Sequence, residues 1–213
     1  MHVNVKPQWP VLRRGLVAIL RGIRPHEAVD AIEVLVAEGF EAAEIPLNSP
    51  DPFESISRAT GAFGERCLIG AGTVLTPDDV DRLAECGGRL IVSPNFDSQV
   101  IAQAEALGLV SMPGVFTASE ALLALRAGAS ALKFFPASVL GPSGIAAIRA
   151  ILPPETIIGA VGGVSETSFA AYAKAGVKVF GLGTSLYRPG DKADDVRAKA
   201  RTAIAAYDAA FLT

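Results

Sequence analysis

Residues 157–185, IIGAVGGVSETSFAAYAKAGVKVFGLGTS, contain one complete strand–helix–strand unit. The stretch opens with the apolar run Ile157–Val161 and closes with a second apolar run, Val179–Leu182. Between the two runs, Ser165 is placed to cap an amphipathic helix over Thr167–Ala175. Short apolar runs bounded by glycine are typical of buried parallel strands, and such strands need a crossover connection between them. The stretch therefore predicts two neighbouring strands of a parallel sheet.

The same unit recurs along the rest of the chain. Helix signals separate further apolar runs: Pro25 begins a helix that ends at Gly39, and Thr76 caps a helix that begins with Pro77. A final amphipathic helix is predicted over Lys192–Phe211. The remaining apolar runs, each a predicted strand, are Leu16–Leu20, Ala42–Pro46, Cys67–Ala71, Leu90–Val92, Leu109–Met112 and Ala131–Phe135.

These strand–helix units predict an α/β protein, a (β/α)₈ TIM barrel that forms a single domain over residues 1–213. Because such barrels usually have about 250 residues, we expect short loops. We also expect an N-terminal extra helix over Lys6–Arg14 that covers the bottom of the barrel, with Trp9 as its anchor. The alternative fold is an open doubly wound sheet, which is disfavoured because no GxGxxG motif follows the first strand.

The composition excludes several classes of protein. The chain is 50% hydrophobic and 19% charged, against about 25% charged in a typical domain, which excludes a disordered chain. A net charge of −3 without a basic run argues against nucleic-acid and membrane-surface partners. No apolar stretch reaches the ~18 residues of a membrane span, and Met1–Pro10 does not resemble a signal peptide. The two cysteines suit a reducing compartment, so we expect a cytoplasmic location.

The histidine count limits the chemistry. His2 and His26 are the only histidines, and His2 lies close to the chain end. A histidine-based metal site cannot be built from them, and a Ser-His-Asp triad is disfavoured. We therefore expect a reaction that needs no metal and no other cofactor.

Polar residues stand where the predicted strands should be apolar. The active sites of parallel barrels lie at the carboxyl ends of the strands. Arg21 ends the first predicted strand, Glu44 lies in the second, and Lys133 lies in the sixth. Thr73 and Pro94 end the third and fourth strands, which makes them candidates for substrate binding. Because a buried charge is costly unless it is paired, these charges mark a candidate site.

Lys133 is the strongest of these candidates. A lysine in an apolar pocket suits Schiff-base formation with a carbonyl substrate, and the attacking amine must be neutral. An ordinary lysine has a pKa of about 10.4. Desolvation among Leu132, Phe134 and Phe135 would lower this pKa, as would nearby Arg21, whereas an ionised Glu44 would raise it. Glu44, the one acidic side chain in the upper halves of the strands, is the candidate for moving protons. The alternative interpretation is a structural ion pair between Lys133 and Glu44.

Glycines follow the last two predicted strands. Gly162-Gly163 and Gly183-Thr184 would expose backbone N–H groups, and we expect helix N-termini to follow both, as in the phosphate sites of such barrels. Neither loop contains lysine or arginine, so backbone dipoles would bind the phosphate. Glycines also make tight turns, and this alternative remains open.

Together these residues resemble the class I pyruvate-dependent aldolases that act on 2-keto-3-deoxy-6-phosphosugar acids. The resemblance extends from Leu16 to about Gly190, and within the family the galactonate branch is the most similar. The stretches that carry it are Ala18-Ile19-Leu20-Arg21-Gly22, Glu44-Ile45-Pro46-Leu47-Asn48-Ser49-Pro50, Gly70-Ala71-Gly72-Thr73-Val74-Leu75, Ala131-Leu132-Lys133-Phe134-Phe135-Pro136 and Ala160-Val161-Gly162-Gly163-Val164.

The resemblance implies cleavage of a small-molecule substrate, 2-dehydro-3-deoxy-6-phosphogalactonate, to pyruvate and D-glyceraldehyde 3-phosphate. It implies Lys133 as the Schiff-base residue and Glu44 as the general acid and base. It also implies a homotrimer, which would cover surplus apolar surface. The substrate ligands that it implies are Arg21 and Thr73, with Gly162, Gly163, Gly183 and Thr184 around the phosphate.

Two positions bear on the choice of substrate within that family. Gluconate-specific relatives usually have an arginine where this chain has Asn48, so Arg21 is expected to supply the missing positive charge. Such relatives also tend to have threonine where Val161 stands, which makes Val161 a candidate selector of the C4 configuration. Thr184 replaces a serine of many relatives and keeps a hydroxyl group.

Three alternatives remain open. The enzyme could act on the gluconate epimer or on both epimers. A sugar-phosphate isomerase or epimerase is disfavoured, because those barrels commonly use metal-binding histidines or a differently placed acidic pair. A non-catalytic phosphosugar-binding barrel would use Lys133 and Glu44 only as a structural pair.

Overall fold

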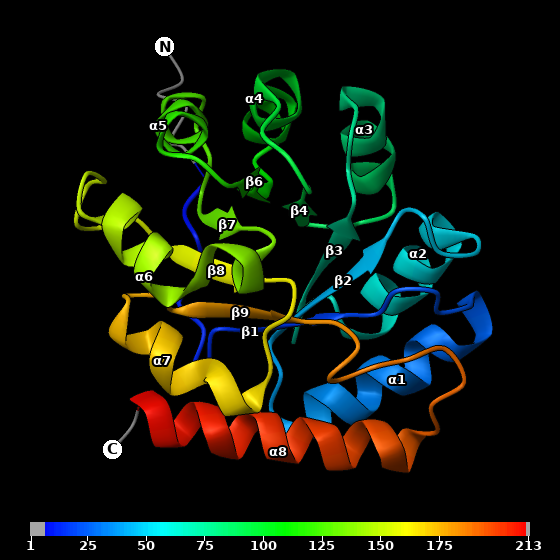
Figure 1. Cartoon of the computed structure of the whole chain (residues 1–213). Helices are drawn as coiled ribbons and strands as arrows, with labels where there is room; N and C mark the ends of the chain where they lie inside the picture. Colours follow the sequence, from blue (N-terminus) through cyan, green and yellow to red (C-terminus); the bar gives the residue numbers. More distant parts are fainter. Residues whose placement is uncertain (1–6, 212–213) are drawn as a thin grey trace.

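The computed structural model describes residues 7–211, in which parallel strands alternate with helices along the chain (Figure 1). The strands are β1 (Leu16–Ile19), β2 (Ala42–Pro46), β3 (Leu68–Gly72), β4 (Leu90–Val92), β5 (Val110–Met112), β6 (Gly114–Val115), β7 (Leu132–Phe134), β8 (Ile158–Val161) and β9 (Val179–Leu182). The helices are α1 (Pro25–Glu38), α2 (Pro52–Phe63), α3 (Pro77–Glu85), α4 (Ser98–Ala106), α5 (Ala118–Arg126), α6 (Ala137–Arg149), η1 (Glu166–Ser168), α7 (Phe169–Lys174) and α8 (Ala193–Phe211).

The strands form one parallel sheet in the order β5-β4-β3-β2-β1-β9-β8-β7-β6. Its two end strands, β5 and β6, are separated only by Pro113, which has no N–H to donate. The carbonyl of Pro113 accepts a hydrogen bond from the Lys133 N–H (2.9 Å), and that of Ser111 accepts one from the Ala131 N–H (3.1 Å). β5 and β6 are therefore two halves of one strand that joins β4 to β7. The predicted α/β class and parallel barrel are confirmed.

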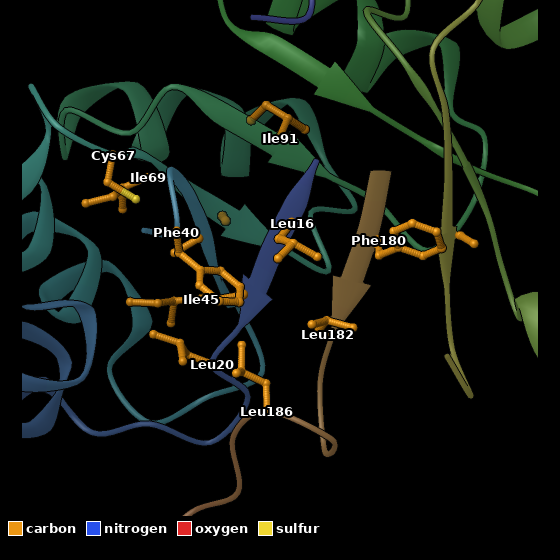
Figure 2. Packing of buried hydrophobic residues seen from close by; sticks show 14 of the residues in the cluster. Leu16, Leu20, Phe40, Ile45, Cys67, Ile69, Ile91, Phe180, Leu182 and Leu186 are labelled. Carbon is orange, nitrogen blue, oxygen red and sulfur yellow. The ribbon is translucent and has the colours of Figure 1, made fainter. Parts of the chain in front are cut away.

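Side chains alternate between the inside and the outside of this barrel, as the period of a strand requires. Inward residues such as Val17, Val92 and Met112 form one apolar cluster. Outward residues pack against the helices in a larger cluster, part of which Figure 2 shows around Leu16 and Phe180. The barrel interior is therefore apolar at its base, below the polar side chains near the carboxyl ends of the strands.

The N-terminal helix predicted over Lys6–Arg14 is wrong for the described part of that segment. Residues 7–14 contain no helix, and Lys6 lies outside the described residues. Pro10 accounts for this, because it lacks an N–H and disfavours helical backbone at the preceding residue. Trp9 nevertheless packs, with Leu12, against the inner apolar cluster. The base of the barrel is thus covered by an irregular segment.

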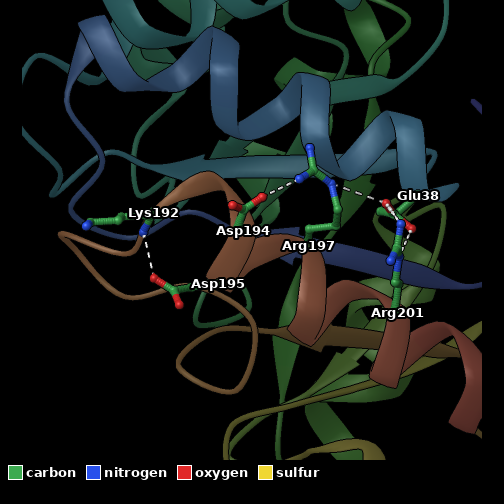
Figure 3. Close-up of polar contacts among 6 residues, drawn as sticks. All are labelled: Glu38, Lys192, Asp194, Asp195, Arg197 and Arg201. Carbon is green, nitrogen blue, oxygen red and sulfur yellow. Dashed lines mark hydrogen bonds and ion pairs between the residues drawn. The ribbon is translucent and has the colours of Figure 1, made fainter.

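The C-terminal helix α8 packs beside α1 and α7 (Figure 1). Figure 3 shows Arg197 and Arg201 of α8 reaching Glu38 at the end of α1, at 3.5 and 2.8 Å. Further along α8, Asp208 accepts two hydrogen bonds of 2.6 Å from Arg14, a buried residue just before β1. These contacts fix the first and last elements to each other.

Candidate active site

Lys133 and Glu44 both point into the barrel. Lys133 on β7 is 6% exposed, and Glu44 on β2 is 2% exposed. Glycines surround them in the sheet register: Gly114 and Gly159 pair with Lys133, and Gly70 pairs with Glu44. Cβ atoms at Gly114, Gly159 and Gly70 would overlap Pro94, Met112 and Leu90, so these glycines let neighbouring groups pack closely around the pair.

Gly72 supports the site in a way that was not predicted from the sequence. A Cβ atom built on Gly72 would overlap the carboxylate of Glu44, so only glycine fits beneath that group. The sequence signal was present in Gly70-Ala71-Gly72, a glycine-rich strand next to the strand that carries Glu44. What was missing was the register that places Gly72 against the carboxylate.

The interior location sets the protonation of the pair. Burial raises the pKa of the Glu44 carboxyl to about 7, against the opposing positive charges of Lys133 and Arg21. Burial also lowers the pKa of the Lys133 amine to about 8; the Glu44 charge opposes this shift and the Arg21 charge adds to it. Both groups therefore change protonation close to neutral pH, as proton transfer and amine attack require.

The Glu44 carboxyl has an unusual environment. Its Oε2 atom is buried and, among the described residues, has no hydrogen-bond partner. It lines a small cavity whose other residues are apolar, among them Val17, Met112 and Val161. A buried polar atom without a partner is costly, which favours the neutral carboxyl over the carboxylate.

A larger cavity, of about 300 Å³, opens above this interior. It shares Ile19, Val161 and Gly181 with the small cavity beside Glu44, so the two adjoin. Six residues singled out from the sequence line it: Arg21, Val161, Gly162, Gly163, Gly183 and Thr184. The fold thus brings together residues from β1, β8 and β9 and from the loops that follow them.

The glycine loop after β8 has a backbone that demands glycine. Gly162 and Gly163 have φ values of 88° and 72°, which side chains disfavour. Within residues 7–211, the backbone N–H groups of Gly163 and Thr184 have no hydrogen-bond acceptor. These donors border the cavity, where an anionic group would satisfy them.

The helix start expected after the first glycine loop is present, because Ser165 caps η1, which continues directly into α7. The one expected directly after Gly183 and Thr184 is wrong, since α8 begins only at Ala193. The chain instead turns after Gly183, whose carbonyl accepts hydrogen bonds from Leu186 (2.8 Å) and Tyr187 (2.9 Å). Any anion binding there relies on loop N–H groups rather than on a long helix.

The remaining candidates lie on the same carboxyl edge. The Arg21 guanidinium donates a hydrogen bond of 2.5 Å to the Asn48 side chain at the mouth of the barrel. Thr73 follows β3 with a φ of 58°, a strained value for this residue. Pro94 follows β4, and its carbonyl lies against Gly114 beside Lys133. Thr73 and Pro94 are not part of the lining of the 300 Å³ cavity.

The described residues hold no group of three or more His, Cys, Asp and Glu side chains arranged to bind a metal ion. None of the helices within residues 7–211 combines the length and apolar character needed to cross a membrane.

A buried lysine beside a carboxyl group in a parallel barrel points to a barrel enzyme that works through its amine, and comparison with known proteins defines the class further. The family model for KDPG and KHG aldolase matches residues 11–200. A probable 2-dehydro-3-deoxy-6-phosphogalactonate aldolase of Rhizobium meliloti is 60% identical over 95% of both chains. The Escherichia coli 2-dehydro-3-deoxy-6-phosphogalactonate aldolase is 46% identical over 94% of this chain and 97% of its own.

A solved structure of native KDPGal agrees with these relatives. It superposes with a TM-score of 0.94 and 45% identity, over 97% of this chain and all of the other. The chain belongs to the KDPG and KHG aldolase family.

The contact between Gly72 and Glu44 gives a first prediction. Gly72→Ala is expected to lower the free energy of unfolding by about 1–3 kcal/mol, because the added methyl group overlaps a buried carboxyl group. Gly183→Ala is the control, since a Cβ there meets nothing within 4 Å. The double variant Gly72→Ala/Glu44→Ala should recover most of the lost free energy of unfolding, as measured by urea unfolding. Equal losses of stability in the two glycine variants, or no recovery in the double variant, would contradict the overlap.

Proposed function

We propose that the chain is a class I aldolase that cleaves 2-dehydro-3-deoxy-6-phosphogalactonate to pyruvate and D-glyceraldehyde 3-phosphate. The observation that carries the proposal is the pair of Lys133 and Glu44, both buried within the barrel and both shifted to titrate near neutral pH. The substrate follows from the high identity to two relatives that bear its name.

Lys133 performs the first step. Its neutral amine attacks the C2 ketone to form a carbinolamine, which takes a proton from the Glu44 carboxyl, loses water and becomes a protonated imine. When the C3–C4 bond breaks, its electron pair forms the C2=C3 double bond of an enamine, and the electron pair of the C=N double bond moves onto the nitrogen. A lysine whose pKa is lowered to about 8 supplies far more neutral amine at pH 7 than an ordinary lysine.

Glu44 moves the protons. The carboxylate removes the proton of the C4 hydroxyl, directly or through a water molecule, as the C3–C4 bond breaks and the aldehyde forms. The enamine left on Lys133 is then protonated at C3, and water releases pyruvate and the free amine. A carboxyl group with a pKa of about 7 can serve both as the base and as the acid.

The cavity of about 300 Å³ holds the rest of the substrate. Gly162, Gly163, Gly183 and Thr184 bind the phosphate, supported by the free N–H groups that border the cavity. Arg21, held by Asn48, attracts the carboxylate of the pyruvate part. Thr73 and Pro94 complete the substrate contacts from the ends of β3 and β4. Val161 lines both cavities and selects the configuration of the substrate at C4.

The assembly and location of the enzyme are also proposals. Residues 1–213 act as one catalytic domain in the cytoplasm, with a small-molecule substrate and no nucleic-acid or membrane partner. A homotrimer would cover large apolar side chains that are exposed on the α3–α5 side of the barrel: Leu75, Leu107, Phe116 and Leu123. The second candidate function is cleavage of the gluconate epimer, which differs only at C4.

Borohydride reduction tests the proposed chemistry. With pyruvate present, the protein should gain the mass of one reduced pyruvate on Lys133, because borohydride fixes the imine as a stable amine. The Lys133→Ala variant should form no adduct, whereas replacing the exposed Lys174 of α7, in Lys174→Ala, should leave the adduct intact. The Glu44→Gln variant should still form the adduct but should cleave the substrate much more slowly. An unmodified native protein would refute the aldolase and favour a binding role.

The pH dependence of the trapping gives an independent prediction. The trapping rate should rise with pH and reach its midpoint near pH 8, as Lys133 loses its proton. Glu44→Gln should move the midpoint down, because it removes a negative charge that raises the lysine pKa. Arg21→Met should move the midpoint up, because it removes a positive charge that lowers the same pKa. Shifts in the same direction would contradict this electrostatic account.

Substrate choice is tested with the two C4 epimers. The native enzyme should have the higher kcat/KM for the galactonate compound, and Val161→Thr should narrow the ratio by adding a hydroxyl group beside C4. Val164→Thr serves as the control, because Val164 lines the larger cavity but not the small cavity beside Glu44. A preference of the native enzyme for the gluconate compound by more than about tenfold, or about 1.4 kcal/mol, would reverse the assignment.

A further inference from the structure

The nitrogen of Lys133 lies over the face of an aromatic ring. The distance from Nζ to the centroid of the Phe135 ring is 4.7 Å. This is within the ~6 Å range in which a cation is attracted to the negative face of an aromatic ring. From the sequence, Phe135 is expected only to help Leu132 and Phe134 keep water away from Lys133.

The ring is held in this place by the glycine loop. A Cβ atom on Gly162 would lie 3.0 and 3.1 Å from the Cδ2 and Cε2 atoms of Phe135, so the ring packs closely over the bare glycine backbone. The ring is half-buried and forms part of the wall of the 300 Å³ cavity. Phe135 thus contacts the lysine, the glycine loop and the proposed substrate cavity.

No stronger partner competes for the nitrogen. Among the residues that the structure describes, Lys133 Nζ makes no hydrogen bond and no ion pair, and the nearby Arg21 charge disfavours a cation there. Glu44 acts on the nitrogen only through the longer-range attraction of opposite charges. Within residues 7–211, the Phe135 ring face is therefore the one group in contact with the nitrogen that favours a positive charge on it.

We propose that Phe135 is a further catalytic residue, whose ring face stabilises the positive charge on the Lys133 nitrogen in the ammonium ion and in the protonated imine. The imine part of this inference rests on the proposed aldolase function. A carboxylate in contact would hold a proton on the amine and suppress attack. A neutral ring favours the cation more weakly than a carboxylate does, so the amine still loses its proton near neutral pH. The same ring face still stabilises the flat, positively charged imine.

Fluorinated phenylalanines at position 135 test the proposal. Each added fluorine withdraws electron density from the ring face and changes the size of the ring little. From phenylalanine to the trifluoro form, the midpoint of borohydride trapping with pyruvate should fall stepwise by about one pH unit in total. The pyruvate concentration for half-maximal trapping, measured well above the midpoint, should rise about tenfold because the protonated imine loses the same stabilisation.

Phe134 provides the matched control. It is the adjacent residue, but it points outward into the core between sheet and helices. The same fluorinated residues at position 134 should leave the midpoint unchanged. Phe135→Leu, which keeps the apolar cover without the ring face, should lower the midpoint about as far as the trifluoro residue.

The outcomes separate the two proposals. If the adduct forms in every variant and the midpoint does not follow fluorination at position 135, Phe135 is only an apolar cover and this inference is overturned. A shift with Phe135→Leu but none across the fluorinated series leads to the same conclusion. If the native protein forms no adduct at any pH, the proposed aldolase function itself fails.

Discussion

The organisation of this protein depends on keeping an amine and a carboxyl group out of water inside one barrel. Burial destabilises the charged form of each group, whereas each charge stabilises the other. The balance places both pKa values near neutrality. A deeper apolar layer around Val17, Val92 and Met112 keeps water away from below, and the substrate cavity opens above. The pair therefore lies where the apolar interior of the barrel meets its mouth.

Glycines occupy the strand positions beside that pair. Gly114 and Gly159 pair with Lys133 in the sheet, and Gly72 leaves the space that the Glu44 carboxyl occupies. Pro113 interrupts the strand next to Lys133, but its carbonyl still accepts the Lys133 N–H and so keeps the barrel joined. Glycine in a strand normally weakens it, which means that local strand stability is lower where the chemistry needs space. The cost is offset by dense packing between the sheet and its helices.

Much of this arrangement could be predicted from the sequence, because buried parallel strands appear as short apolar runs between glycines and prolines. Ala42–Pro46, Leu90–Val92 and Val179–Leu182 have the predicted bounds, and Lys133 was visible as a charge within such a run. The contact of Gly72 depends on the register between two strands, which no local pattern specifies. The strand period places Phe135 on the side of Lys133, but its ring contact with the nitrogen also depends on packing against Gly162. The prediction of an N-terminal helix was wrong because Pro10 disfavours helical backbone. Trp9 packs against the inner apolar cluster from an irregular segment instead.

The Phe135 ring links the two parts of the proposed substrate site, the loop proposed for the phosphate and the nitrogen of Lys133. Gly162 borders the cavity proposed for the phosphate, and the same residue supports the Phe135 ring that faces the lysine nitrogen. Because Gly162 has a φ of 88° and no room for a Cβ, the loop and the ring fix each other's position. A loop conformation that suits the phosphate therefore also sets the ring against the nitrogen. Binding energy from a remote group of the substrate can in this way hold the reacting atoms in place.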